Sequence, residues 1–404
     1  MFRLANRLAD VRPSQTKAMT ARAQVLRSQG HEIITLSQGE PDFDTPVNIA
    51  AAGVAAIESG KTRYTAVAGI PELRAAIAEK LERDNGLDYA ADQIMASCGA
   101  KQVIFNAFLA TLDEGDEVIV PAPCWVSYPD MVRLAAGTPV IVDCAADAGF
   151  KLQPDQLAAA ITPRSRWLVL NSPANPTGAV YGERELAALA EVLRRHPQVS
   201  VLCDDIYEKL VYPPARFATL ACVAPDLQAR ILIVNGVSKA HAMTGWRVGY
   251  GAGPAELVKA MATIQGQTSS HTSSISQYAA LEALRGDQSY LPDFVKIFEA
   301  RRDLICDRLS RAPGLTCGVP DGAFYVFVSC RDLLGAETPD GRTIQSDADF
   351  ALYLLEQFGV AVVPGSSFLA EGYVRISYAA STQALERACQ SILAACTSLA
   401  REVV

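Results

Sequence analysis

Short apolar runs that alternate with amphipathic stretches are the feature that most limits the fold of this chain. Residues 183–195, for example, have the 3.6-residue period of a helix with one buried face. Strand-like runs that alternate with such helices are typical of an α/β domain. The runs that we expect to be strands are residues 117–120, 139–142, 166–170, 199–202 and 230–234.

The runs are almost continuously apolar, which predicts a sheet covered by helices on both faces. Sheets of this kind bind ligands where their strands end. Asn171, Asp204 and Gly236 each stand just after a run. We therefore expect these three positions to meet in one site.

Length and charge narrow the class of protein. A chain of 404 residues is long for a single core and suggests two domains. Its formal charge is 36 − 44 = −8, and its pI is near 5.2. Nucleic-acid binding needs a basic face, so we expect no nucleic acid among its partners.

The cysteines and the N-terminal residues indicate the cellular compartment of the protein. The ten cysteines show neither C-x-x-C pairing nor metal-ligand spacing with the four histidines. We therefore expect no metal site and free, mostly buried thiols in a reducing compartment. The first thirty residues lack a signal-peptide pattern, and no apolar run approaches the ~20 residues of a membrane span. The sequence thus predicts a soluble cytoplasmic protein without a membrane partner.

Four separated motifs suggest the chemistry of this chain. Lys239 lies in residues 237–249 (VSKAHAMTGWRVG), directly after an apolar run. A single lysine is usually a solvated surface residue, but three further motifs in this chain accompany the one that contains Lys239. The other motifs are residues 171–178 (NSPANPTG), 204–207 (DDIY) and 373–378 (YVRISY). In order and spacing the four resemble the fold-type I, class I aminotransferases, which use pyridoxal 5′-phosphate, over nearly the whole chain.

The resemblance implies an architecture. It implies a large cofactor domain of residues 46–300, with a mainly parallel seven-stranded sheet between helices. It also implies a small α+β domain built from residues 1–45 and 301–404. The residues themselves predict a long helix at 293–311 and strands at 322–328 and 360–364, but not that the two chain ends belong together. A homodimer with shared active sites is implied as well.

Pyridoxal phosphate chemistry needs an amine for the aldehyde, a protonated ring nitrogen and an anchored phosphate. The resemblance assigns the amine to Lys239, which also moves a proton at the substrate Cα. It assigns the ring nitrogen to Asp204, although the residues alone favour Asp204 and Asp205 equally. Tyr207 and Asn175 are expected to bind the phenolic oxygen. Asn-Pro-Thr-Gly is also a strong turn signal, and the resemblance favours a cis bond after Asn175.

The phosphate is expected at the start of a helix, whose free N–H groups bind anions. The resemblance places Gly99, Ala100 and Lys101 there and adds Arg247 as a charge-assisted partner. Relatives often carry a serine at the position of Gly236. Other cofactor contacts that the resemblance implies are Ser238 in place of that serine, Trp125 stacked on the ring, and Tyr64 on the phosphate of the neighbouring subunit.

For the substrate, Arg375 resembles the arginine that clamps the α-carboxylate, and the Gly39 N–H is expected to assist it. Trp125 and Asn175 are also expected to contact the substrate. The sequence of residues 39–46 (GEPDFDTP) most resembles that of the bacterial aspartate/prephenate aminotransferase branch. There, residues at the positions of Lys101 and Arg12 contact acidic side chains. We therefore expect a ping-pong aminotransferase for aspartate or glutamate and 2-oxo acids.

The sequence departs from the family pattern at two places, and two alternative functions remain open. Cys124 replaces the usual aromatic residue beside Trp125, and His271 and Thr272 stand where relatives usually read Asn-Pro. Such changes could admit aromatic or other substrates, although His271 alone predicts a solvated loop histidine. A β-lyase or cyclopropane-forming synthase of the same fold is one alternative. A cofactor-sensing transcription regulator is the other, and the negative charge disfavours it.

Overall fold

The computed structural model describes residues 2–9, 11 and 15–400. A seven-stranded sheet in the order β2-β8-β7-β6-β5-β3-β4 forms its centre. All neighbouring pairs are parallel except those made by β8, which confirms the expected mainly parallel sheet. The strands are β2 (Ile94–Ser97), β3 (Glu117–Ala122), β4 (Thr138–Asp143), β5 (Ser165–Asn171), β6 (Ser200–Asp204), β7 (Ile231–Gly236) and β8 (Gly249–Ala252).

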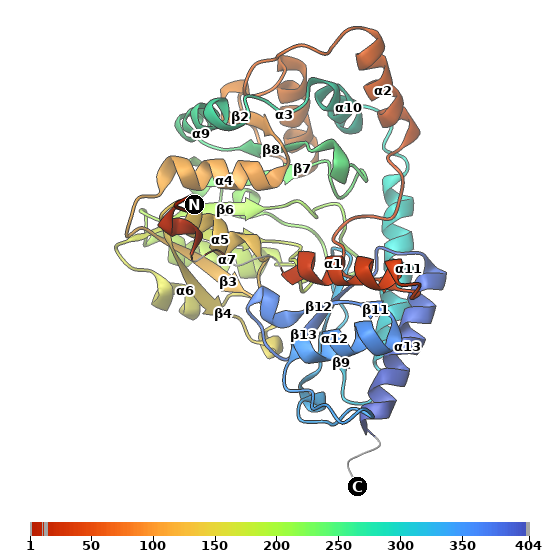
Figure 1. Ribbon diagram of the computed structural model, residues 1–404. Coiled ribbons are helices and arrows are strands. Elements are labelled where there is room, and N and C mark those ends of the chain that lie inside the picture. The colour runs from red at the N-terminus through yellow and green to blue at the C-terminus, as the bar shows by residue number, and fades with distance from the viewer. Residues whose placement is uncertain (1, 10, 12–14, 401–404) are drawn as a thin grey trace.

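Helices cover both faces of this sheet (Figure 1). Successive residues of a strand point to opposite faces. Val118 and Val120 accordingly pack in one core cluster with α4, α5 and α9, whereas Ile119 packs in another with α3 and α7. The helices of this part are α2 (Val47–Glu58), α3 (Pro71–Asn85), α4 (Ala100–Thr111), α5 (Ser127–Leu134), α6 (Pro154–Ala160), α7 (Glu183–Arg194), α8 (Leu220–Val223), α9 (Ala255–Thr268) and α10 (Ser274–Arg285).

The two ends of the chain form a second region, which the long helix α11 (Leu291–Leu309) joins to the first (Figure 1). β1 (Ile34–Thr35) pairs in parallel with β11 (Val360–Ala361), so residues more than 320 positions apart lie side by side. A four-stranded antiparallel sheet has the order β12-β13-β10-β9. The other elements here are α1 (Gln15–Ser28), β9 (Thr316–Cys317), β10 (Tyr325–Ser329), α12 (Asp347–Phe358), β12 (Val363–Pro364), β13 (Tyr373–Ser377) and α13 (Thr382–Ala400).

Three adjacent strands end at the same edge of the large sheet. Asn171, Asp204 and Gly236 are the last residues of β5, β6 and β7, and Asn171 is in register with Asp204. The carboxyl ends of parallel strands are where α/β sheets bind ligands. Asn171 and Asp204 both line one cavity at this edge, whereas Gly236 does not, so the expectation of a shared site is confirmed for two of the three positions. Among the residues described, no helix is long and apolar enough to cross a membrane.

Candidate active site

A cavity of about 510 Å³ opens at this edge of the sheet. Residues from both regions line it, because β10 and β13 contribute to one side. The lining residues that the sequence had singled out are Gly39, Ala100, Lys101, Trp125, Asn175, Asp204, Tyr207, Ser238, Lys239, Arg247 and Arg375. The structure thus gathers four motifs that are far apart in the chain.

Lys239 follows β7 in a tight segment that directs its amine into the cavity. Its Nζ donates a hydrogen bond of 2.5 Å to the carbonyl oxygen of Gly39. Burial, together with the charge of Arg375, lowers the pKa of Lys239 to about 8. A fraction of the amine is therefore neutral near pH 7, as a nucleophile or proton acceptor requires.

Asp204 lines the cavity, whereas Asp205 does not. Tyr128 Oη donates to Asp204 Oδ2 at 2.5 Å, and the Ile206 N–H faces Oδ1 at 3.4 Å. Burial raises the pKa of Asp204 to about 6, against the lowering effect of the Tyr128 hydrogen bond. Most of this carboxyl is therefore ionised at pH 7. Consecutive residues at a strand end point in opposite directions, which separates the two aspartates.

A phenolic pair and an amide occupy the side of the cavity next to the second region. Tyr207 Oη and Tyr325 Oη are hydrogen-bonded at 2.8 Å. Asn171 Oδ1 accepts from the Asn175 N–H at 2.9 Å, which orients the turn that carries the Asn175 amide. The Asn175–Pro176 bond is cis, as expected. Gly39 is packed so closely that a Cβ there would lie 2.6 Å from Tyr325 Oη.

Arg375 is a buried cation on β13, only 4% exposed. Its Nη1 donates to Asn175 Oδ1 at 2.9 Å and its Nη2 to the Ser37 carbonyl oxygen at 2.7 Å. Within the described part of the chain, its Nε has no hydrogen-bond partner and its charge no acidic partner. Burial lowers its pKa, yet arginine stays protonated. An unpaired buried cation is costly, so this site favours an anionic ligand.

The start of α4 lies against Arg247 at the cavity wall, where Arg247 Nη2 donates to the Cys98 carbonyl oxygen at 3.3 Å. Gly99 precedes this helix with φ +84, and no side chain caps the helix. A Cβ on Gly99 would lie 2.4 Å from Arg247 Nη2, and one on Gly249 would lie 2.2 Å from the Ala100 nitrogen. Both glycines therefore let the helix start, the guanidinium and β8 approach one another. Helix N–H groups opposite an arginine form a site for a phosphate.

Gly236 and Ser238 differ in the space around them. A Cβ at Gly236 would lie 2.9 Å from both the Val248 carbonyl oxygen and the Gly249 Cα. Ser238 in contrast lines the cavity. This close packing leaves little room for a side chain at position 236. Ser238 is therefore the residue after β7 whose hydroxyl can face the cavity.

Lys101 and Trp125 lie together at the cavity wall. Lys101 Nζ is 4.7 Å from the centre of the Trp125 ring, a cation–π distance. The Trp125 ring meets Tyr128 edge to face, with centroids 5.2 Å apart. Because Tyr128 also bonds Asp204, the ring and the carboxylate are held in one arrangement.

Of the expected residues that the structure describes, Tyr64 and Gly99 do not line this cavity, and two tyrosines that contact the site were missed. Tyr64 is 91% exposed and lines no part of it. Arg12 lies outside the residues that the structure describes. Tyr325 lay within a predicted strand and Tyr128 was not singled out, although each bonds a site residue. The proximity of Tyr128 to Trp125 was an available signal, whereas Tyr325 looks like any core aromatic of a strand.

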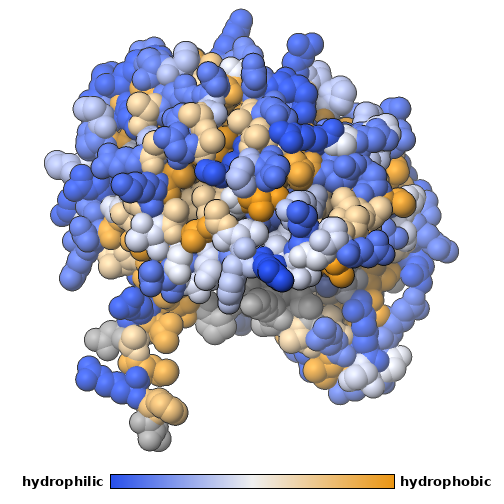
Figure 2. Space-filling model, turned by 90° about the horizontal axis from the view of Figure 1, so that it is seen from above, coloured by the Kyte–Doolittle hydropathy of each residue, from blue (hydrophilic) through white to orange (hydrophobic). Residues whose placement is uncertain are grey.

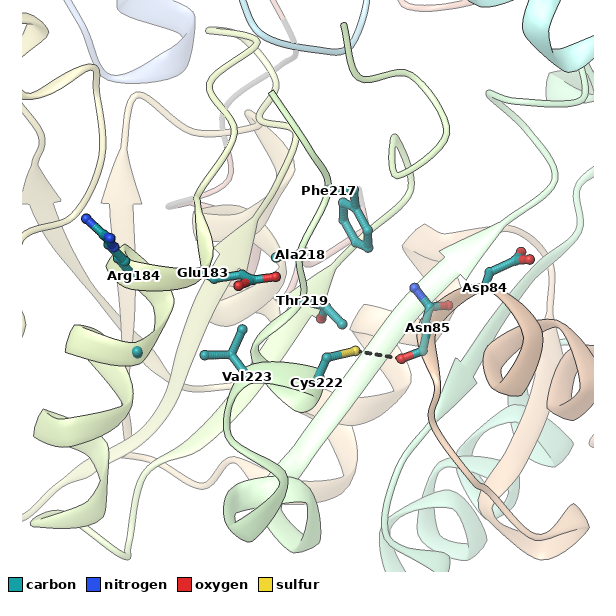
Figure 3. Close-up of a pocket in the computed structure, with 10 residues that line it drawn as sticks. Asp84, Asn85, Glu183, Arg184, Phe217, Ala218, Thr219, Cys222 and Val223 are labelled. Carbon is teal, nitrogen blue, oxygen red and sulfur yellow. Dashed lines mark hydrogen bonds between the residues drawn. The ribbon is translucent and has the colours of Figure 1, made fainter. Parts of the chain in front are cut away.

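A second cavity, of about 570 Å³, lies between the end of α3, the start of α7 and residues 217–223 (Figure 3). Cys222 Sγ donates to the Asn85 carbonyl oxygen at 2.9 Å on its wall. None of the site residues expected from the sequence lines it. It is therefore a separate feature from the candidate active site.

Comparisons with known proteins agree with this arrangement. Residues 31–392 match the family Aminotransferase class I and II. The chain is 54% identical to the aspartate/prephenate aminotransferase of Cereibacter sphaeroides, over 98% of this chain and 99% of that protein. The aspartate aminotransferase structure from Rhizobium meliloti has a TM-score of 0.96 at 50% identity and covers 99% of this chain and 100% of that one. The Thermus thermophilus aspartate aminotransferase with maleate has a TM-score of 0.91 at 42% identity, covering 98% and 100%.

A lysine, a carboxylate and two arginines in one cavity of an α/β fold define an amino-group-transferring enzyme of fold-type I. The chain belongs to the class I and II aminotransferases. The expected family and its bacterial branch are thereby confirmed. Members of this family use pyridoxal phosphate and act on amino acids and 2-oxo acids.

Proposed function

We propose that this enzyme transfers the amino group between aspartate or glutamate and a 2-oxo acid by a ping-pong mechanism, with pyridoxal 5′-phosphate as its cofactor. The observation that carries the proposal is the single cavity that contains Lys239, Asp204, Arg247 and Arg375. Relatives that are 50–54% identical over nearly their whole length carry aspartate in their names, which supports the substrate class.

The residues present fit this cofactor. The uncapped helix start at Gly99 and Ala100, with Ser238 and Arg247, suits its phosphate. Asp204, mostly ionised at pH 7, suits a protonated ring nitrogen. The other residues that would hold it are Lys239 at the aldehyde, Tyr207 and Asn175 at the phenolic oxygen, and Trp125, with Lys101 beside it, against the ring. When bound, the cofactor supplies an electron sink for the electron pair at the substrate Cα.

Arg375 is proposed to bind the substrate α-carboxylate. Its free Nε and its lack of an acidic partner among the described residues are the reasons. The Asn175 and Ser37 oxygens hold its two Nη atoms, so the guanidinium is oriented before the substrate arrives. A clamped carboxylate fixes the Cα–H bond relative to Lys239, whose amine would remove the proton from Cα of the amino acid in one half-reaction and return a proton to Cα of the 2-oxo acid in the other. Gly39 remains our proposal for a backbone N–H that assists Arg375.

We propose a homodimer with shared sites. Val47, Val54 and Ile57 of α2 are 85%, 52% and 54% exposed, and Tyr64 follows this helix. Figure 2 shows this end of the molecule, where hydrophobic residues reach the surface between hydrophilic ones. A second copy would cover these side chains, and Tyr64 would then contact the phosphate in the partner's cavity. Arg12 remains a proposed aid to substrate binding.

We further propose that residues 46–300 form the cofactor domain and residues 1–45 with 301–404 the small domain. The pairing of β1 with β11 supports this division, because it joins the two chain ends. A cytoplasmic location is also proposed, since all ten cysteines are free.

A substrate screen tests the proposed function. Half-reactions with single amino acids are followed by the cofactor absorbance, and we expect aspartate and glutamate to react fastest. With aspartate and 2-oxoglutarate together, an aminotransferase forms oxaloacetate and glutamate in equal amounts without free ammonia. Ammonia release would instead indicate a lyase, and a preference for phenylalanine would indicate an aromatic aminotransferase.

Lys101→Ala tests the acidic specificity. If Lys101 binds the distal carboxylate, the KM for aspartate and glutamate should rise on the order of 10–100-fold, since a charge-assisted hydrogen bond contributes about 1.5–3 kcal/mol. The KM for a neutral amino acid should change much less, and cofactor binding should persist through the backbone at residue 101. Steady-state kinetics measure this, with Lys259→Ala, an exposed lysine on α9, as control. Equal losses for acidic and aromatic substrates would refute the role.

A further inference from the structure

His271 lies between α9 and α10 and is not the solvated loop residue that its sequence context predicts. The side chain is half-buried and both ring nitrogens are hydrogen-bonded. Its Nε2 accepts from the backbone N–H of Thr65 at 3.3 Å, and its Nδ1 lies 2.7 Å from the Thr272 carbonyl oxygen. The expectation of a solvated histidine is therefore wrong, because the ring fills a gap between two distant segments.

These partners determine the tautomer of His271. A backbone N–H can only donate, so Nε2 must be unprotonated. A carbonyl oxygen can only accept, so Nδ1 carries the proton. A neutral ring with its proton on Nδ1 thus connects Thr65 with Thr272.

The His271 ring also supports Tyr64. The two rings meet edge to face, with centroids 5.6 Å apart. Tyr64 is 91% exposed, so within this chain few other atoms restrict its side chain. Such an edge-to-face contact contributes beyond the area that it buries.

The same loop reaches the proposed phosphate site. Thr272 Oγ1 donates to the Arg247 carbonyl oxygen at 2.8 Å. The buried Gln277 donates through Nε2 to Thr65 Oγ1 at 3.0 Å and to the Thr272 carbonyl oxygen at 2.8 Å. The segment of Tyr64 and the backbone of Arg247 are therefore tied to one loop, and His271 is the side chain that faces Tyr64.

We propose that His271 is a positioning residue that holds Tyr64 in place for the cofactor phosphate of the partner subunit. The inference rests on the proposed function, in which Tyr64 makes that contact. His271 itself acts only through Tyr64 and the Thr65 backbone.

A double-mutant cycle tests the proposal, with release of pyridoxal phosphate from the holoenzyme as the measurement. Tyr64→Phe should speed cofactor release. His271→Ala should speed it roughly 3- to 10-fold, the range expected for one hydrogen bond. In the Tyr64→Phe background, His271→Ala should have little further effect, because residues that act through one another are not additive. The KM for aspartate, measured at saturating cofactor, should change little.

Two conservative variants separate positioning from general destabilisation. In His271→Gln the new side-chain Oε1 can still accept from the Thr65 N–H. Cofactor release should therefore be nearly as slow as in the unmodified enzyme. His271→Asn keeps a donor for the Thr272 carbonyl oxygen but is too short to reach Thr65, so release should stay fast. His31→Gln, at an exposed histidine, is the matched control.

Each failure has a distinct meaning. If Tyr64→Phe leaves cofactor release unchanged, the shared-site part of the proposed function is wrong. If Tyr64→Phe speeds release but His271→Ala does not, only the positioning role is overturned. The positioning role is also overturned if His271→Ala acts equally in both backgrounds, or if His271→Asn matches His271→Gln.

Discussion

Lys239→Ala is expected to abolish turnover while the protein still folds. The amine both holds the cofactor aldehyde and moves the proton at the substrate Cα in the proposed function. The loss in kcat should therefore exceed the roughly 10²–10⁴-fold that is typical for removal of one general base. Single-turnover kinetics with aspartate measure it, and circular dichroism checks the fold.

Lys259→Ala is the matched control for this variant, since Lys259 is an exposed lysine away from the cavity. It should retain full activity. Cofactor can still bind to the Lys239→Ala protein without a covalent link, because the phosphate and ring contacts remain. Substantial turnover by that protein would show that another group performs the proton transfer.

Asp204→Asn should retain the fold and lose activity on the order of 10²–10³-fold in kcat, as for the loss of one preorganised electrostatic partner. Asp204 is buried, lines the cavity and is mostly ionised at pH 7. An amide has the same shape but cannot stabilise a protonated ring nitrogen. The Tyr128 hydroxyl can still donate to the amide oxygen, so the packing should survive.

Asp205→Asn is the control for this prediction and should be much milder. Asp205 is also buried but lies outside the cavity lining. Burial raises the pKa of Asp205 well above its ordinary value, which favours the neutral acid, and an amide has the same shape. The kcat values of Asp204→Asn and Asp205→Asn, measured side by side, test this prediction. A larger loss in Asp205→Asn would show that the ring-nitrogen partner has been misassigned.

Much of the fold and of the site could be predicted from the sequence because the signals are local. A run such as 199–202 is apolar at nearly every position, and a strand covered on both faces has that pattern. Each of the motifs around Asn175, Asp204 and Lys239 is one unbroken stretch of sequence, and each follows a strand. The carboxyl ends of parallel strands share one edge of the sheet, so the meeting of these residues follows from order along the chain.

Local patterns do not specify which distant segments close the site. Arg375 is held by Asn175 and by the backbone of Ser37, 200 and 338 residues away. Tyr325 sits in a buried strand, where its sequence context is the same as that of a core aromatic, yet its hydroxyl bonds Tyr207. The pairing of β1 with β11 likewise joins the two ends of the chain without a sequence signal.

By itself the sequence determined the α/β architecture, the motif residues and the chemistry that they imply, since residue type and period are properties of neighbouring positions. Without the family resemblance the residue pattern left Asp204 and Asp205 equal, and the tertiary structure showed that only Asp204 lines the cavity and that His271 lies against Tyr64. The physical reason is that side-chain direction depends on the strand end or loop that carries the residue. Contacts across hundreds of residues depend in turn on how the elements pack, which no local pattern records.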